Sequence, residues 1–267
     1  MSYTADEMMT IAAARQLRNG DVCFVGIGLP GAACNLARMT HAPDLVLIYE
    51  SGTVGTRPER LPLSIGDGEL AQTAAYVVSL PEVFAYYLQA GRVDIGFLGA
   101  AQMDRFGNLN STAIGDYAQP HTRLPGAGGA PEIAAHAAQT FVVMKANPRS
   151  MVEALDFRTS GGFLEGHGTR QTQGLRGAGP QVVITDIGIL RPAPGSQELQ
   201  LHEIYPGASV EQARAAFGWP LQVTNALQTL GAPSARELET LRALQRRSAI
   251  AHLHRQPLPL HLLDTCP

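Results

Sequence analysis

The stretch LVLIYESGTVG at residues 45–55 joins an apolar run to a carboxylate and then to a series of small residues. The run LVLIY has the length and the aliphatic composition of a buried strand. Glu50 follows at the point where this strand ends, and the glycines beyond it predict a turn. Because ligands of parallel sheets gather beyond the carboxyl ends of the strands, Glu50 is a candidate site residue.

Helical and strand patterns alternate on both sides of this stretch. Helices are predicted at 4–20, 30–40, 79–91 and 130–137, and further strands at 21–27, 93–100 and 140–144. Thr4 with Glu7, and Ser79 with Glu82, have capping-box spacing at two of the helix starts. Strands that alternate with helices of this length predict an α/β fold with an open, mostly parallel sheet and helices on both faces.

The composition is that of a folded protein that acts on a small molecule. Of the 267 residues, 45% are hydrophobic, and the net charge of −3 comes without a basic stripe, so neither a nucleic-acid nor a membrane partner is expected. No apolar run is long enough to span a bilayer, and the first residues lack signal-peptide features, so we expect a cytoplasmic protein. Cys23, Cys34 and Cys266 lack metal-ligand spacing, which predicts reduced thiols and no metal site.

The second half of the chain is less regular. A glycine-rich stretch at about 158–180 precedes the strand patterns QVVITDIGIL and ELQLHEI, and Ser234 with Glu237 opens a predicted C-terminal helix at about 234–254. We interpret 1–267 as a single domain with an irregular excursion. A linker between two domains is the alternative, because long glycine-rich stretches are uncommon inside compact domains.

One competing hypothesis is a dinucleotide-binding module. GIGLPG at 26–31 matches G-x-G-x-x-G between a predicted strand and a predicted helix, and Glu50 lies about twenty residues beyond, where an acid would hold the ribose. However, Pro30 removes an N–H group from the helix start that would bind the pyrophosphate. This hypothesis also leaves ESGTVG and GAGGAPE unexplained.

Four segments carry a family resemblance: YESGTVGTRP at 49–58, LPLSIGDGELAQTA at 61–74, DIGFLGAAQMDRFGNLN at 94–110 and RLPGAGGAPEIA at 123–134. They resemble the β subunit of family I coenzyme A transferases, in particular the glutaconate and 3-oxoadipate branch. The resemblance runs from about residue 5 to about residue 150, weakens at 158–180 and returns in YPGASVEQARAAFGWP at 205–220. Tyr49 and Ser51 replace the serine and asparagine of the family signature Ser-Glu-Asn-Gly, whereas Glu50 and Gly52 are retained.

The resemblance implies a covalent mechanism on Glu50. This carboxylate would take CoA from an acyl-CoA, with succinyl-CoA as the expected donor, and pass it to a short acid, with 3-oxoadipate from aromatic catabolism as the expected acceptor. The CoA thioester is then a substrate, and no tightly bound cofactor or metal is implied. The backbone of Gly128 and Gly129 would bind CoA and the oxyanion, although a simple tight turn is the alternative for these glycines.

A dicarboxylic acceptor also needs a cation for its distal carboxylate, and Arg57, Arg60 and Arg123 are candidates. The family further implies an α subunit as partner, in a heterodimer or heterotetramer. A CoA-thioester hydrolase or a ring-cleaving relative on the same fold remains the alternative function. No role is assigned to Asp67, Glu69, Asp104 and Arg105.

Overall fold

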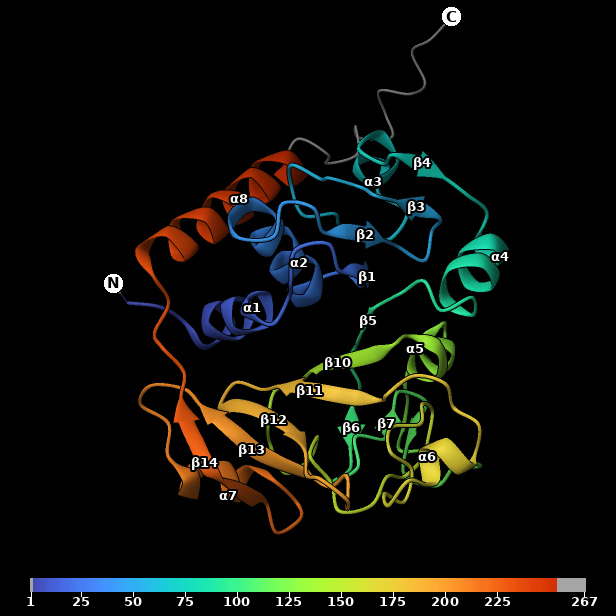
Figure 1. The fold of residues 1–267 in the computed structure, drawn as a ribbon, viewed down its shortest axis with the longest axis vertical. Coiled ribbons are helices and arrows are strands. Elements are labelled where there is room, and N and C mark those ends of the chain that lie inside the picture. The colour runs from blue at the N-terminus through green and yellow to red at the C-terminus, as the bar shows by residue number, and fades with distance from the viewer. Residues whose placement is uncertain (1, 254–267) are drawn as a thin grey trace, which may run out of the picture.

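A ten-stranded sheet runs through the computed structural model, which describes residues 2–253 (Figure 1). In spatial order its strands are β14 (Gln222–Thr229), β13 (Leu199–Ile204), β12 (Gly188–Pro192), β11 (Pro180–Ile184), β10 (Gln139–Val143), β5 (Ile95–Leu98), β1 (Val22–Phe24), β2 (Val46–Ile48), β3 (Thr53–Val54) and β4 (Tyr76–Val77). Two small sheets pair β6 (Gln102–Met103) with β7 (Leu109–Asn110), and β8 (Ala113–Ile114) with β9 (Thr122–Arg123).

The helices are α1 (Ala5–Arg15), α2 (Leu29–Thr40), α3 (Gly68–Gln72), α4 (Leu80–Glu82), the π-helix η1 (Val83–Leu88), α5 (Ala130–His136), α6 (Thr169–Thr172), α7 (Val210–Ala216) and α8 (Ala235–Leu253). Between Ser2 and Leu253, no helix is long and apolar enough to cross a membrane.

The centre of the large sheet is parallel, antiparallel pairs flank it on both sides, and the outermost pair β13–β14 is parallel again. Strands β2, β1, β5, β10 and β11 pair in parallel, because helical crossovers return the chain to the same end of the sheet each time. At one margin β3 and β4 add antiparallel strands, and at the other β12 pairs antiparallel with both of its neighbours. The predicted open, mostly parallel sheet is therefore confirmed.

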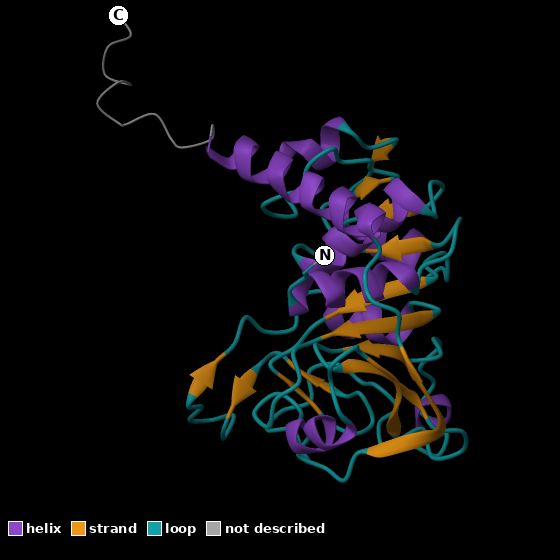
Figure 2. Ribbon diagram, turned by 90° about the vertical axis from the view of Figure 1, so that its left-hand side faces the viewer, coloured by secondary structure: helices purple, strands orange, loops and turns teal. Residues whose placement is uncertain are grey.

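Alternate residues of each central strand enter different cores. Cys23, Leu47 and Phe141 belong to the cluster that is covered by α1, α2 and α8, which pack against one another. Phe24 and Ile48 belong to a second cluster on the opposite face, with side chains from η1 and α5. The layers of helices and strands are visible in Figure 2. This alternation follows from the two-residue period of a strand and confirms the prediction of helices on both faces.

Most of the predicted helix starts have the expected capping. At Thr4 the side chain and Glu7 exchange hydrogen bonds with the opposite backbone N–H groups, and Ser79 forms a capping box with Glu82. The segment at 79–91 differs from an ordinary α-helix, because after one turn of α4 it continues as the π-helix η1. This wider helix places Phe84 against Phe24, with ring centroids 5.8 Å apart.

The glycine-rich stretch at 158–180 forms loops around the short helix α6. Beyond it, Ser234 and Glu237 exchange cap hydrogen bonds at the start of α8. The predicted end of this helix at residue 254 and the thiol of residue 266 lie outside the described residues. Cys23 and Cys34 are buried free thiols.

Candidate active site

Glu50 lies at the corner of a tight turn between β2 and β3. The Tyr49 N–H donates to the carbonyl of Thr53 (3.1 Å), and the Gly52 N–H donates to the carbonyl of Tyr49 (2.9 Å). Gly52 has a φ of +98°, and a β-carbon there would collide with the carbonyl oxygen of Val78. The turn therefore needs glycine at this position, and it holds Glu50 just beyond the end of a buried strand.

The Glu50 side chain lines an open cavity of about 410 Å³. Other parts of the wall come from Phe24 and Gly26 after β1, from Ser111 after β7, and from the loop at 125–130. The Glu50 carboxylate makes no hydrogen bond or ion pair with any other residue among 2–253, so both of its oxygens are free to meet a substrate. Among the described residues that line this cavity, only Glu50 has an ionisable side chain.

Gly128 and Gly129 line the same cavity, and Gly129 lies directly against Glu50. A β-carbon on Gly129 would be 3.2 Å from Glu50 Oε1 and 2.7 Å from Cζ of Phe84, so glycine allows this close approach. The N–H groups of Gly128 and Gly129 donate no hydrogen bond within the described part of the chain. The structure thus brings together the three residues that the sequence predicted for the reacting centre.

A family comparison agrees with this geometry. Residues 6–216 match the model of the family described as coenzyme A transferase. The chain belongs to the coenzyme A transferase family.

Similar proteins place this transferase chain among the β subunits of family I. It is 54% identical over 251 residues to the β subunit of the 3-oxoadipate CoA-transferase of Pseudomonas knackmussii, covering 94% of this chain and 96% of the relative. It is 37% identical over 249 residues to the β subunit of the glutaconate CoA-transferase of Acidaminococcus fermentans, covering 90% and 92%. The crystal structure of glutaconate CoA-transferase from that organism superimposes with a TM-score of 0.85 at 35% identity, covering 90% of this chain and 94% of that one. The predicted family, fold and enzyme class are confirmed, and an α-subunit partner is implied by the names of these relatives.

Tyr49, one of the two departures from the family signature, faces away from the cavity. Its ring lies in the core beneath α1 and α2, on the face of the sheet opposite to the α5 side. The phenol is fully buried without a hydrogen-bond partner among the described residues, and burial raises its pKa well above the usual range. Since neighbouring residues at a strand end point to opposite faces, a tyrosine here leaves Glu50 exposed to the cavity.

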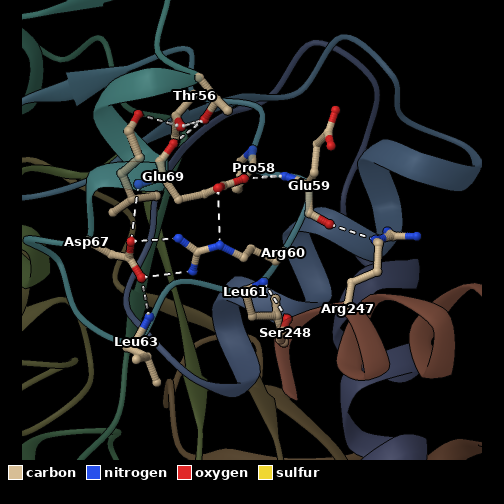
Figure 3. A network of polar contacts seen from close by, with 12 residues as sticks. Thr56, Pro58, Glu59, Arg60, Leu61, Leu63, Asp67, Glu69, Arg247 and Ser248 are labelled. Carbon is tan, nitrogen blue, oxygen red and sulfur yellow. Dashed lines mark hydrogen bonds and ion pairs between the residues drawn. The ribbon is translucent and has the colours of Figure 1, made fainter. Parts of the chain in front are cut away.

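Arg60 is engaged within the transferase chain itself. Its guanidinium binds both carboxylate oxygens of Asp67, each at 3.0 Å, and Glu69 at 3.2 Å (Figure 3). Asp67 also accepts a hydrogen bond from the N–H of Glu69 and so caps α3. Asp67 and Glu69 thus have structural roles, and Arg60 is held by them.

Arg57 and Arg123, the predicted substrate-binding residues, both lie outside the lining of the Glu50 cavity. Arg57 is exposed, and its backbone N–H donates to the carbonyl of Thr73 (3.2 Å). Arg123 is exposed on β9, and its guanidinium carbon lies 4.9 Å from the ring centroid of Tyr117. Their role in binding substrate stays a prediction.

Asp104 and Arg105 line a different cavity of about 570 Å³, which shares no lining residue with the Glu50 cavity. Asp104 accepts hydrogen bonds from the N–H of Phe106 and from both the N–H and the side-chain amide of Asn108. Burial raises the pKa of Asp104, and these hydrogen bonds partly oppose the rise. The carboxylate organises the turn between β6 and β7.

The loop GIGLPG contributes to the cavity wall and also packs against α2. Gly26 lines the Glu50 cavity, whereas a β-carbon on Gly31 would lie 3.1 Å from the carbonyl oxygen of Gly26, so α2 packs closely on this loop. Pro30 lies in the first turn of α2, where proline is tolerated. Ser111 and Ile65 also line the cavity and were not predicted from the sequence. Ile65 lies in a turn and Ser111 follows the two-residue strand β7, so neither comes after an apolar run long enough to indicate a buried strand.

Proposed function

We propose that this β subunit, with an α subunit, transfers CoA from succinyl-CoA to 3-oxoadipate through a thioester on Glu50. The observation that carries the proposal is the unpartnered Glu50 carboxylate in a cavity against the Gly128–Gly129 loop. The choice of substrates is supported by the 54% identity to the β subunit of a 3-oxoadipate CoA-transferase, which covers almost the whole of both chains. The setting that we infer is aromatic catabolism in the cytoplasm.

In the first half-reaction, a Glu50 oxygen attacks the thioester carbonyl of succinyl-CoA. The C–S bond breaks, which leaves a mixed anhydride on Glu50 and releases the CoA thiolate. The thiolate then attacks the glutamyl carbonyl, succinate leaves, and the enzyme holds CoA as a glutamyl thioester. 3-Oxoadipate attacks this thioester, and the same two steps in reverse yield 3-oxoadipyl-CoA and restore the Glu50 carboxylate.

Each attack creates a negatively charged oxygen on a tetrahedral carbon next to Glu50. The N–H groups of Gly128 and Gly129 are free, and Gly129 lies against the carboxylate, so they are the proposed donors to this oxygen. Preorganised donors of this kind are each worth about 3 to 4 kcal/mol in the transition state. We propose Arg57 and Arg123 as ligands of the distal carboxylate of the acceptor, at the periphery of the site.

Intact-protein mass spectrometry of the assembled enzyme tests the proposal. After mixing with succinyl-CoA, this chain should gain the mass of one CoA less one water, and 3-oxoadipate should discharge the adduct. Glu50→Ala should form no adduct, whereas Glu59→Ala, which removes an exposed carboxylate nearby, should form it as the wild type does. No adduct in the wild type, together with thioester loss that is independent of added acid, would instead support a hydrolase.

A further inference from the structure

The glycine-rich stretch at 158–180 lies against α5, the helix that follows the loop of Gly128 and Gly129. From within this stretch, the buried side chain of Arg170 donates to the carbonyl of Ala134 in α5 (2.6 Å). This contact fixes the helix beyond the loop. The loop also needs a support at its beginning, before the two glycines.

The loop PGAGG at 125–129 has little support of its own. Three of its five residues are glycine, and glycine has the largest conformational freedom of all residues. Gly126 exchanges two hydrogen bonds within the described part of the chain, both with Ser111. The Gly126 N–H donates to the Ser111 carbonyl (2.8 Å), and the Gly126 carbonyl accepts from the Ser111 hydroxyl (2.8 Å). Ser111 therefore holds the loop at a residue close to both Gly128 and Gly129.

Ser111 is held in turn by Thr159, at the start of the glycine-rich stretch. The Ser111 N–H donates to Oγ1 of Thr159 (2.9 Å), and the hydroxyls of Thr112 and Thr159 lie 2.7 Å apart. The Thr159 N–H donates to the carbonyl of Leu109 in β7 (2.8 Å). A continuous series of hydrogen bonds thus runs from β7 through Thr159 and Ser111 to the loop.

The hydroxyl of Ser111 is engaged, although the residue lines the Glu50 cavity. A serine hydroxyl has one proton to donate, and here the carbonyl of Gly126 accepts it. A nucleophilic serine also needs an adjacent base, and Glu50 is the only ionisable residue in the described lining of the cavity. The geometry of Ser111 therefore fits a structural contact with the loop and not a reaction of its own hydroxyl.

The position of this loop matters because it lies at the reacting centre. A β-carbon on Gly129 would be only 3.2 Å from Oε1 of Glu50. Donors to an oxyanion act through preorganisation, and a shift of about 1 Å in reacting groups can cost about 100-fold in rate. A residue that fixes the loop therefore contributes to the rate without contacting the substrate.

We infer that Ser111 is a positioning residue of the reaction. By fixing Gly126 it holds the N–H groups of Gly128 and Gly129 where the oxyanion forms, and Thr159 supports it from the glycine-rich stretch. The inference rests on the proposed function, because it assigns what holds the proposed donors in place. It also gives the irregular stretch a role as the base of the active-site loop.

Two serine-to-alanine substitutions in the assembled enzyme test this role. Ser150 is the matched control, because it is also half-buried and its hydroxyl also donates to a backbone carbonyl, that of Lys145 (2.7 Å). Rapid-quench mass spectrometry at increasing succinyl-CoA concentrations gives the rate constant for formation of the Glu50 adduct and the Kd of succinyl-CoA. We expect Ser111→Ala to lower the rate constant at least about tenfold and to change the Kd less than about threefold, whereas Ser150→Ala should change neither by more than about twofold.

Three results would overturn the inference. They are a wild-type rate constant in Ser111→Ala, an equal loss in both variants, and a weaker Kd with an unchanged rate constant, which would make Ser111 a substrate ligand. Circular dichroism and thermal melting should show that both variants fold.

Thr159→Val tests the link to the glycine-rich stretch, because valine keeps the shape of threonine and removes the hydroxyl that Ser111 binds. We expect it to lower the same rate constant at least about threefold. In the double variant with Ser111→Ala, the loss should be smaller than the product of the two single losses, because both changes release the same loop. Losses that multiply would show that Thr159 does not act through Ser111.

The outcomes are separable from those for the proposed function. If the wild type forms the Glu50 adduct and Ser111→Ala forms it equally fast, the positioning role is wrong and the function stands. If the wild type forms no adduct on Glu50, but Ser111→Ala slows the loss of succinyl-CoA about tenfold at an unchanged KM, the positioning role stands and the function is wrong.

Discussion

Gly129 lies so close to Glu50 that a single added carbon on the glycine would be 3.2 Å from the Glu50 carboxylate oxygen Oε1. The same carbon would be 2.7 Å from the ring of Phe84, so Gly129→Ala must displace the ring, the loop or the carboxylate. A small displacement of reacting groups can cost about 100-fold in rate. We expect kcat to fall by about 10- to 100-fold, measured with succinyl-CoA and 3-oxoadipate, while the melting temperature falls by a few degrees at most.

Gly231→Ala is the matched control, because a β-carbon at this exposed position meets no atom within 4 Å. Its kcat should equal that of the wild type. Full activity of Gly129→Ala would show that the close approach to Glu50 is not needed for the reaction.

Tyr49→Phe should keep both stability and activity. The Tyr49 hydroxyl is buried without a partner among the described residues, so its removal eliminates the cost of an unsatisfied polar group. We expect the free energy of unfolding from urea titration to stay the same or to rise by up to about 1 kcal/mol, with kcat unchanged. A tenfold fall in kcat in Tyr49→Phe would place the phenol in the reaction after all.

Arg170 holds the glycine-rich stretch together from the inside. Its guanidinium is fully buried and donates to the carbonyls of Gly177 (2.6 Å), Gly161 (3.1 Å), Gly162 (2.9 Å) and Ala134 (2.6 Å). Burial lowers its pKa to about 10, so the group stays cationic near neutral pH. Because Arg170→Met leaves these carbonyls unsatisfied, we expect a loss of at least about 3 kcal/mol in the free energy of unfolding by urea titration.

Arg158→Met provides the comparison within the same stretch. Arg158 forms an exposed ion pair with Glu165 (2.9 Å), and such pairs contribute little. Its substitution should change the free energy of unfolding by no more than about 0.5 kcal/mol. If both variants lose the same amount, the buried hydrogen bonds of Arg170 do not hold this region.

The ion pair between Arg15 and Glu237 should make part of the stability depend on pH. Burial by itself raises the pKa of Glu237, but hydrogen bonds from Arg15 and Ser234 outweigh it and lower the pKa to about 2. Because the pKa of Glu237 is lower in the folded protein than its unfolded value near 4.5, the ionised carboxylate stabilises the fold at pH values above 4.5. This stabilisation is lost as the pH falls toward 2. This pair is partly exposed, and solvent screens it. We therefore expect it to contribute about 1 kcal/mol to the free energy of unfolding.

The measurement compares urea unfolding of the wild type and Glu237→Gln at pH 6 and pH 3. Glutamine keeps the cap of α8 but removes the charge. The wild type should be more stable by about 1 kcal/mol at pH 6, and the difference should shrink at pH 3. A difference that is the same at both pH values would mean that the ion pair is not its source.

Local patterns in the sequence determined the α/β class, the capped helix starts and the position of Glu50 at a strand end. These features depend on residues within a few positions of one another: the run before Glu50, the glycines after it, and the pairs Thr4–Glu7 and Ser79–Glu82. The family resemblance added the roles of Glu50, Gly128 and Gly129, because the motifs are recognisable without knowledge of their spatial order.

The tertiary structure alone decided which of these features meet. Glu50 and Gly129 become neighbours because β5 lies between β1 and β10 in the sheet, and strand order depends on how distant segments pack. The same long-range contacts add the antiparallel strands β3 and β4 at one margin of the sheet and engage Arg60 with Asp67 and Glu69. A chain's local pattern specifies each element, whereas side-chain contacts between elements far apart in the sequence specify the site.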